Sequence, residues 1–157
     1  MGERRETPAT DEEDDMRVMV IVKGDERTEA GVMPTAEELD AMGRFNTELV
    51  NAGIMLAGEG LKPTRDGVRI AYEGGGRASA TDGPFAETKE LIAGFWILEV
   101  TSMDEAVEWM RRAPFGPGES IDIRPVFELE DFGEELTPET RAAEEGRRRR
   151  IEEQHAG

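Results

Sequence analysis

Residues 91–100 read LIAGFWILEV, an almost wholly apolar stretch that predicts the central strand of the fold. A second stretch, RVMVIVK at residues 17–23, has the same character and predicts another strand. A strand of an antiparallel sheet with one face in water alternates apolar and polar side chains, whereas both stretches are apolar at consecutive positions. We therefore expect both faces of the sheet that contains them to be covered.

Two helices are predicted between the strands, each from a capping box followed by apolar residues at helical spacing. Thr35 and Glu38 form the first box, and the helix they open ends at Gly53. Ser102 and Glu105 form the second box, which opens a shorter helix.

The remaining strands are expected to be short, at residues 54–59, 68–72, 78–81 and 121–127. The order along the chain is therefore β-α-β-β-α-β with a small extra hairpin, which predicts a ferredoxin-like α+β fold with both helices on one face of an antiparallel sheet. A second copy of the sheet is the economical cover for the other face. We therefore expect a homodimer with dimeric α+β barrel-type association.

The two ends of the chain differ from this central domain, which we place at residues 16–136. Residues 1–15 hold seven acids, two Arg and no aromatic residue, a composition that predicts disorder. Residues 137–157 open with Thr137 and Pro138, an N-cap and first-position pair, and continue with charged helix formers. They predict a solvated C-terminal helix or a frayed tail.

Charge and composition exclude several classes of function. The net charge of −17 opposes binding to nucleic acid or to an anionic membrane. The longest apolar run, residues 92–98, is far too short to span a bilayer, and the N-terminus has no apolar segment of the kind found in secretory signals. The chain has no Cys, so we expect no disulfide and no thiolate site, and we predict a cytoplasmic protein.

Metals and cofactors are not expected either. The single imidazole, His155, lies in the charged tail, and the acidic run at residues 11–15 lacks EF-hand spacing. No glycine run has the G-x-G-x-x-G spacing of a dinucleotide site. The four arginines at 147–150 are flanked by glutamates and indicate a charged helix face.

The stretch TDGPFAETKE at residues 81–90 resembles the DGPF motif of the YCII-related proteins. Residues 16–24, 31–64, 91–100 and 121–133 are similar to the same family, so the resemblance covers about residues 16–136. It implies a dimeric ferredoxin-like fold with a pocket between the sheet and the first helix. It also implies an acid–base pair formed by a His at the start of that helix and an Asp near its end. Glu37 and Asn51 stand roughly where those two residues would be, which puts the pair in doubt.

The candidate site residues come mainly from this motif. On one interpretation, Asp82 accepts hydrogen bonds from backbone N–H groups and holds a turn with Gly83 and Pro84. On the other, it joins a ligand pocket. The proposed pocket residues are Asp82, Phe85, Glu87, Thr88, Lys89 and Glu59. Glu59 lies between two glycines that allow a ligand to approach, although a solvated acid at a strand end is the alternative.

The expected function is binding of a small metabolite by a dimer. Two alternatives remain open. One is a cofactor-free lyase, hydrolase or isomerase that uses Asp82, Glu59 or Glu37 as acid or base. The other is a non-enzymatic regulatory module, because some relatives are linked to extracytoplasmic-function sigma factors. Apolar residues at core spacings, with one or two of them lining a pocket, include Met33, Met42, Met55, Phe95, Trp96 and Trp109.

Overall fold

The computed structural model describes residues 15–85 and 90–156. These residues belong to two compact units, one ending at Pro125 and the other beginning at Val126. The expected domain boundary lay further along the chain, at residue 136.

The first unit is built on a four-stranded antiparallel sheet of β1 (Met16–Lys23), β2 (Met55–Gly60), β5 (Ile92–Val100) and β6 (Ile121–Pro125). Its strand order is β2-β5-β1-β6, so the two most apolar strands occupy the centre, as their sequences predict. The mixed α+β class and the order of elements are confirmed.

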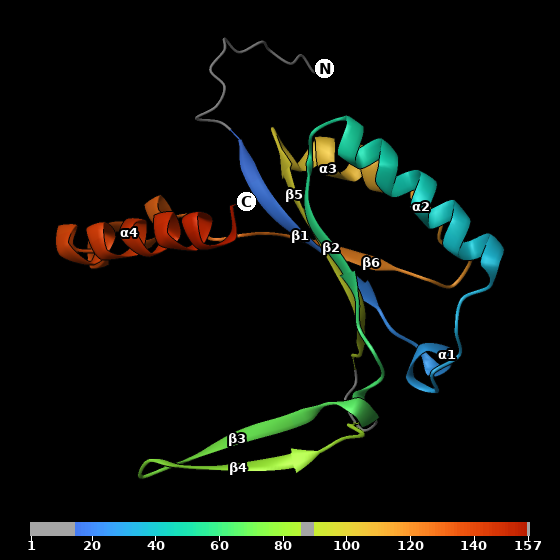
Figure 1. Cartoon of the computed structure of the whole chain (residues 1–157), viewed down its shortest axis with the longest axis horizontal. Coiled ribbons are helices and arrows are strands. Elements are labelled where there is room, and N and C mark those ends of the chain that lie inside the picture. The colour runs from blue at the N-terminus through green and yellow to red at the C-terminus, as the bar shows by residue number, and fades with distance from the viewer. Residues whose placement is uncertain (1–14, 86–89, 157) are drawn as a thin grey trace. The chain divides into compact units, whose positions relative to one another are not determined.

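Two helices pack on one face of this sheet (Figure 1). They are α2 (Ala36–Asn51) and α3 (Met103–Met110). The capping box of α2 is present with both of its hydrogen bonds, and Ser102 caps α3. A single-turn helix, α1 (Glu26–Glu29), was not predicted and has its own capping box formed by Asp25 and Thr28.

The core lies between these helices and the sheet. Alternate residues of β1 and β5 face it, with Val18 and Leu98 fully buried, and α2 adds Leu49. The buried set is Val18, Val20, Phe45, Leu49, Ile54, Trp96, Leu98, Val100, Ala106 and Met110.

The opposite face of the sheet is also apolar at its centre, as the consecutive apolar residues predict. Met19 pairs with Ile97, and Ile21 pairs with Phe95 across the β1–β5 ladder. We call these four residues the open-face patch. They alternate with the core residues of the same strands, so neither α2 nor α3 covers them.

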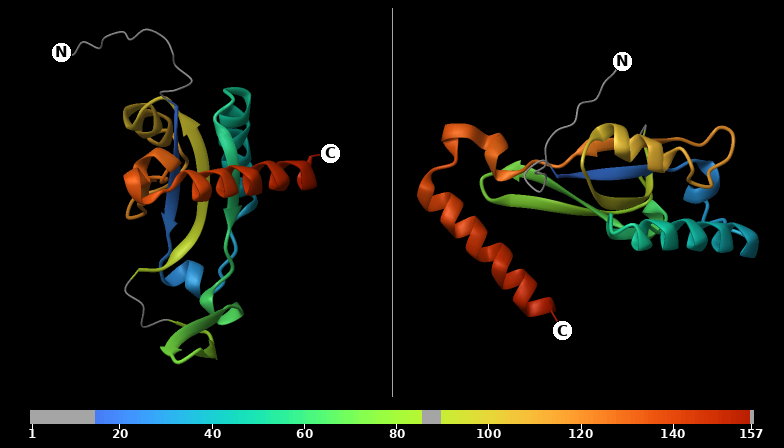
Figure 2. Two further views of the ribbon diagram at one scale, coloured as in Figure 1. Left: turned by 90° about the vertical axis from the view of Figure 1, so that its left-hand side faces the viewer. Right: turned by 90° about the horizontal axis from the view of Figure 1, so that it is seen from above.

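A hairpin of β3 (Val68–Gly74) and β4 (Arg77–Asp82) forms a separate two-stranded sheet. It extends beyond the end of the four-stranded sheet, toward the side that α2 and α3 leave open (Figures 1 and 2). Val68, Ile70 and Tyr72 lie on one face of it and are 57%, 53% and 84% exposed. Two-stranded hairpins are marginally stable alone, and this one leaves three large apolar side chains exposed.

The second unit contains a 3-10 helix, η3 (Leu129–Glu135), and α4 (Pro138–His155). Thr137 caps α4 and Pro138 occupies its first turn, as predicted. Phe127 stacks on Phe132, with ring centroids 5.1 Å apart. Glu144 pairs with Arg147 and Arg148, whose hydrogen bonds lower the pKa of that carboxyl. No helix in the described part of the chain is long and apolar enough to cross a bilayer.

We predict opposite effects of alanine at two glycines. A Cβ at Gly58 would lie 2.8 Å from Cδ1 of Trp96 and 2.7 Å from Cε of Met55, so Gly58→Ala should lower the free energy of unfolding by about 1–3 kcal/mol. A Cβ at Gly43, inside α2, meets no atom within 4 Å, so Gly43→Ala should raise it by about 0.5–1 kcal/mol. Urea unfolding measures both, and two effects of the same sign would contradict this packing.

Candidate functional site

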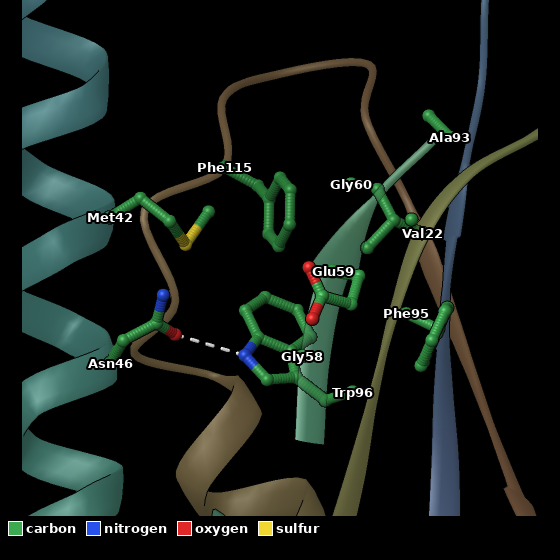
Figure 3. A pocket seen from close by; sticks show the side chains of 11 residues that line it. Val22, Met42, Asn46, Gly58, Glu59, Gly60, Ala93, Phe95, Trp96 and Phe115 are labelled. Carbon is green, nitrogen blue, oxygen red and sulfur yellow. Dashed lines mark hydrogen bonds between the residues drawn. The ribbon is translucent and has the colours of Figure 1, made fainter. Parts of the chain in front are cut away.

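A cavity of about 230 Å³ lies between α2 and the sheet (Figure 3). Met42 and Asn46 line it from α2, and Phe115 lines it from the loop after α3. The sheet contributes Val22 and residues 58–60 and 93–96. We call this space the inner cavity. The pocket expected from the resemblance lies in the same place.

The indole of Trp96 forms one wall of the inner cavity and is held from several directions. Its Nε1–H donates to Oδ1 of Asn46 at 2.9 Å (Figure 3). Phe45 and Phe115 make edge-to-face contacts with it, with centroids 6.0 and 6.2 Å away. The ring is 5% exposed, so this hydrogen bond satisfies a polar group that would otherwise be buried without a partner.

Paired glycines explain why the space is empty. Gly60 lies opposite Gly94 in the β2–β5 ladder, and Gly94 lies opposite Val22 of β1, on the face that α2 covers. Side chains at these positions would fill the gap between helix and sheet. A Cβ on Gly60 would meet a single neighbouring atom, the Ala93 carbonyl oxygen at 4.0 Å, whereas one on Gly94 would lie 2.8 Å from the Glu59 carbonyl oxygen. There is therefore room for a side chain at position 60, whereas a side chain at position 94 would clash with the backbone of β2.

The polar groups of the cavity are an amide and a carboxylate. Asn46 uses its carbonyl oxygen on Trp96, and its amide nitrogen has no partner among the described residues. Glu59 is exposed, and its carboxylate makes no ion pair or hydrogen bond there either. An apolar space with one donor and one acceptor suits a small ligand that is apolar over most of its surface.

The DGPF loop lies apart from this cavity and is held by Thr64 in a short 3-10 turn, η2 (Thr64–Asp66). The Thr64 hydroxyl donates to the carboxylate of Glu29 and accepts from the Phe85 N–H at 2.8 Å. A Cβ on Gly83 would fall 1.7 Å from the Thr64 carbonyl oxygen, so the loop requires glycine there. The Gly83–Pro84 peptide bond is cis.

The contacts expected of Asp82 can be compared only within the described part of the loop, because residues 86–89 lie outside it. It is the last residue of β4, it is exposed, and its carboxylate has no hydrogen bond or ion pair within residues 15–85 and 90–156. The hydroxyl of Thr64, which reaches the loop from a different segment, accepts the hydrogen bond from the Phe85 N–H. Neither Asp82 nor Phe85 lines the inner cavity. The ring of Phe85 lies instead under the guanidinium of Arg69, 4.2 Å from its centroid.

Other candidates are not brought together. Glu37 and Asn51 lie at opposite ends of α2, about 21 Å apart at 1.5 Å per residue, and both are exposed. Glu87, Thr88 and Lys89 lie outside the described residues. Of the proposed pocket residues that the structure describes, Glu59 lines the inner cavity. Within the described part of the chain, no cluster of acids and histidine is suited to a metal ion.

Sequence reasoning missed the roles of Asn46, Phe115 and Gly94. The signal for Asn46 was a polar residue at an inward position of the α2 pattern, next to the buried Phe45. Gly94 interrupts the apolar run of β5 and could have been matched with Gly60. Nothing in the local sequence of Phe115 indicated its contact with Trp96.

Comparison with known proteins gave two matches. The YCII-related domain family matches residues 16–130. An uncharacterized protein of Rhizobium meliloti (strain 1021) is 36% identical over 69 residues, which are 42% of this chain. The chain thus covers about half, 54%, of the length of that protein.

The contacts of the DGPF loop predict different costs for two substitutions. Thr64→Val removes both hydroxyl hydrogen bonds and should lower the free energy of unfolding by about 1–3 kcal/mol, with faster exchange of the Phe85 amide proton. Asp82→Ala should change it by about 0.5 kcal/mol or less. Thr47→Val, which removes one exposed hydroxyl contact on α2, is the matched control. A larger loss in Asp82→Ala than in Thr64→Val would refute this assignment.

Proposed function

The chain belongs to the YCII-related family, and from that premise we propose that it binds a small, largely apolar metabolite in the inner cavity. The observation that supports this proposal is the Gly60–Gly94 pair, which leaves a gap beside a rigidly held indole. Elsewhere between α2 and the sheet, the same strands fill their core positions with Leu, Val or Trp. An unfilled apolar space with converging polar groups is typical of ligand sites.

The alternative function is catalysis, which the position of Glu59 supports. Glu59 is a carboxylate at the wall of the cavity and could exchange a proton with a bound ligand. Asp82 and Glu37, the other acids considered from the sequence, do not line this space. The acid–base alternative therefore depends on Glu59.

We also propose that the protein is a homodimer in which two open-face patches pack together. Met19, Ile21, Phe95 and Ile97 form the centre of this interface. Beyond Ile21 along β1, Lys23 forms ion pairs with Glu90 and Asp122 at 3.1 and 3.2 Å. The β3–β4 hairpin extends toward the same side, and its exposed apolar residues would add to the contact.

The binding proposal predicts that Gly60→Val closes the inner cavity without strain, because the added side chain enters free space. In a thermal-shift screen of metabolites, ligands of this site should raise the Tm of the wild type and leave that of Gly60→Val unchanged. A ligand at about 100 times its Kd stabilises the native state by about 2.7 kcal/mol.

Gly43→Val on α2 adds the same side chain away from the cavity and should retain every response. Ligands that stabilise Gly60→Val as well as the wild type would place binding elsewhere. For a ligand that the protein converts, Glu59→Gln should retain binding and lose turnover.

The dimer proposal predicts that Phe95→Glu weakens association at least about 100-fold, because an unpaired charge would be buried in the interface. Val50→Glu makes the same change at a position that is 58% exposed on α2 and should leave the dimer intact. Sedimentation velocity measures the mass, and circular dichroism verifies that each variant is folded. A wild-type monomer at micromolar concentration would rule the proposal out.

A further inference from the structure

A second space lies next to the inner cavity. Gly60 and Ala93 line both the inner cavity and a groove of about 540 Å³ between the α1–α2 loop and the segment after β2. We call this space the outer groove. Val32, Met33 and Leu61 line it and are 49%, 75% and 50% exposed, so its walls are apolar and unfilled.

Two cations line the outer groove in a strongly acidic protein. Neither Lys62 nor Arg65 forms an ion pair or a side-chain hydrogen bond within the described part of the chain. Lys23, Arg44 and Arg148 are paired, whereas other described bases without an ion pair, such as Arg77 and Arg124, do not line this groove. In a chain of 36 acids and 19 bases, two unpaired cations in one apolar groove indicate an anionic partner.

The side chain of Arg65 lies against the α1–α2 loop. One guanidinium nitrogen lies 2.5 Å from the point that a Cβ on Gly31 would occupy, so this glycine lets the side chain lie against the α1–α2 loop. Its neighbour Thr64 is bound to Glu29, which anchors the backbone beside it. The guanidinium therefore lies beside the groove, next to the α1–α2 loop.

We infer that the ligand is an amphipathic monocarboxylic acid, with an apolar ring in the inner cavity against Trp96 and its carboxylate between Lys62 and Arg65. This inference rests on the proposed function and adds the class of ligand to it. Apolar cavities of about 150 Å³ accommodate benzene, so the inner cavity is large enough for a six-membered ring. The groove is also lined by Asp66, which offsets one of its two cations, and the remaining single positive charge favours one negative charge over the two of a phosphate.

The test compares three probes of one shape: 3-phenylpropionate, the neutral 3-phenylpropanol and the cationic 3-phenylpropylamine. Calorimetry or ligand-observed NMR on the full chain at low salt should show the acid binding about fivefold more tightly than the alcohol, and the amine most weakly. Added salt should reduce the difference in affinity between the acid and the alcohol, because it screens the attraction between the carboxylate and the two cations.

Variants locate the effect. Lys62→Gln and Arg65→Gln should each remove most of the preference for the acid and leave binding of the alcohol unchanged. Arg111→Gln, an equal change of charge at an exposed surface pair on the C-terminal end of α3, is the control. Gly60→Val should abolish binding of both probes.

Each alternative result has a distinct meaning. Equal affinity of the wild type for acid and alcohol would overturn the inference and leave the proposed apolar site intact. A preference for the acid that survives both glutamine substitutions would also overturn it. Failure of all three probes to bind at millimolar concentration would count against the inner cavity as a ring site and so against both proposals.

Discussion

The position of the Trp96 indole governs how helix and sheet meet. Its hydrogen bond to Asn46 joins β5 to α2 across 50 residues of chain, and the edge-on contacts of Phe45 and Phe115 fix its plane. Gly58 permits this arrangement because any larger residue would press on the ring. With the indole fixed, α2 stands away from the sheet where Gly60 and Gly94 lack side chains, and the inner cavity is what remains.

The central strands also place apolar side chains on the face of the sheet that the helices leave open. Val18 and Val20 face the helices, while Met19 and Ile21 between them face away. A strand that is apolar on both faces favours burial of both, and for this reason the sequence pattern predicts that a second copy of the sheet covers the open face. The β3–β4 hairpin independently leaves apolar surface uncovered, because the side chain of Tyr72 is largely exposed to water.

Local patterns predicted the elements well, since capping boxes, alternation and glycine turns act over a few residues. They predicted α2, the central strands and the hairpin, but they missed the short α1. The site was harder to predict from the sequence, because its contacts join segments that lie far apart in the chain. The bond from Thr64 to the DGPF loop spans 21 residues, so the sequence favoured Asp82, which lies within the loop, as the residue that holds it. The contact of Asn46 with Trp96 could not be predicted for the same reason, whereas the glycines around Glu59 are visible in the sequence and do line the inner cavity.

At Gly60, the volume of the cavity can change independently of the packing of the core, although these two properties are usually coupled in a small protein. Residues that shape a binding site often also support the core, so altering them threatens the fold. Here a change at one strand position would resize the site while the packed residues around Trp96 and the hydrogen bonds of the ladder stay as they are. A single replacement at this position can therefore change the volume of the inner cavity without first requiring compensating mutations elsewhere.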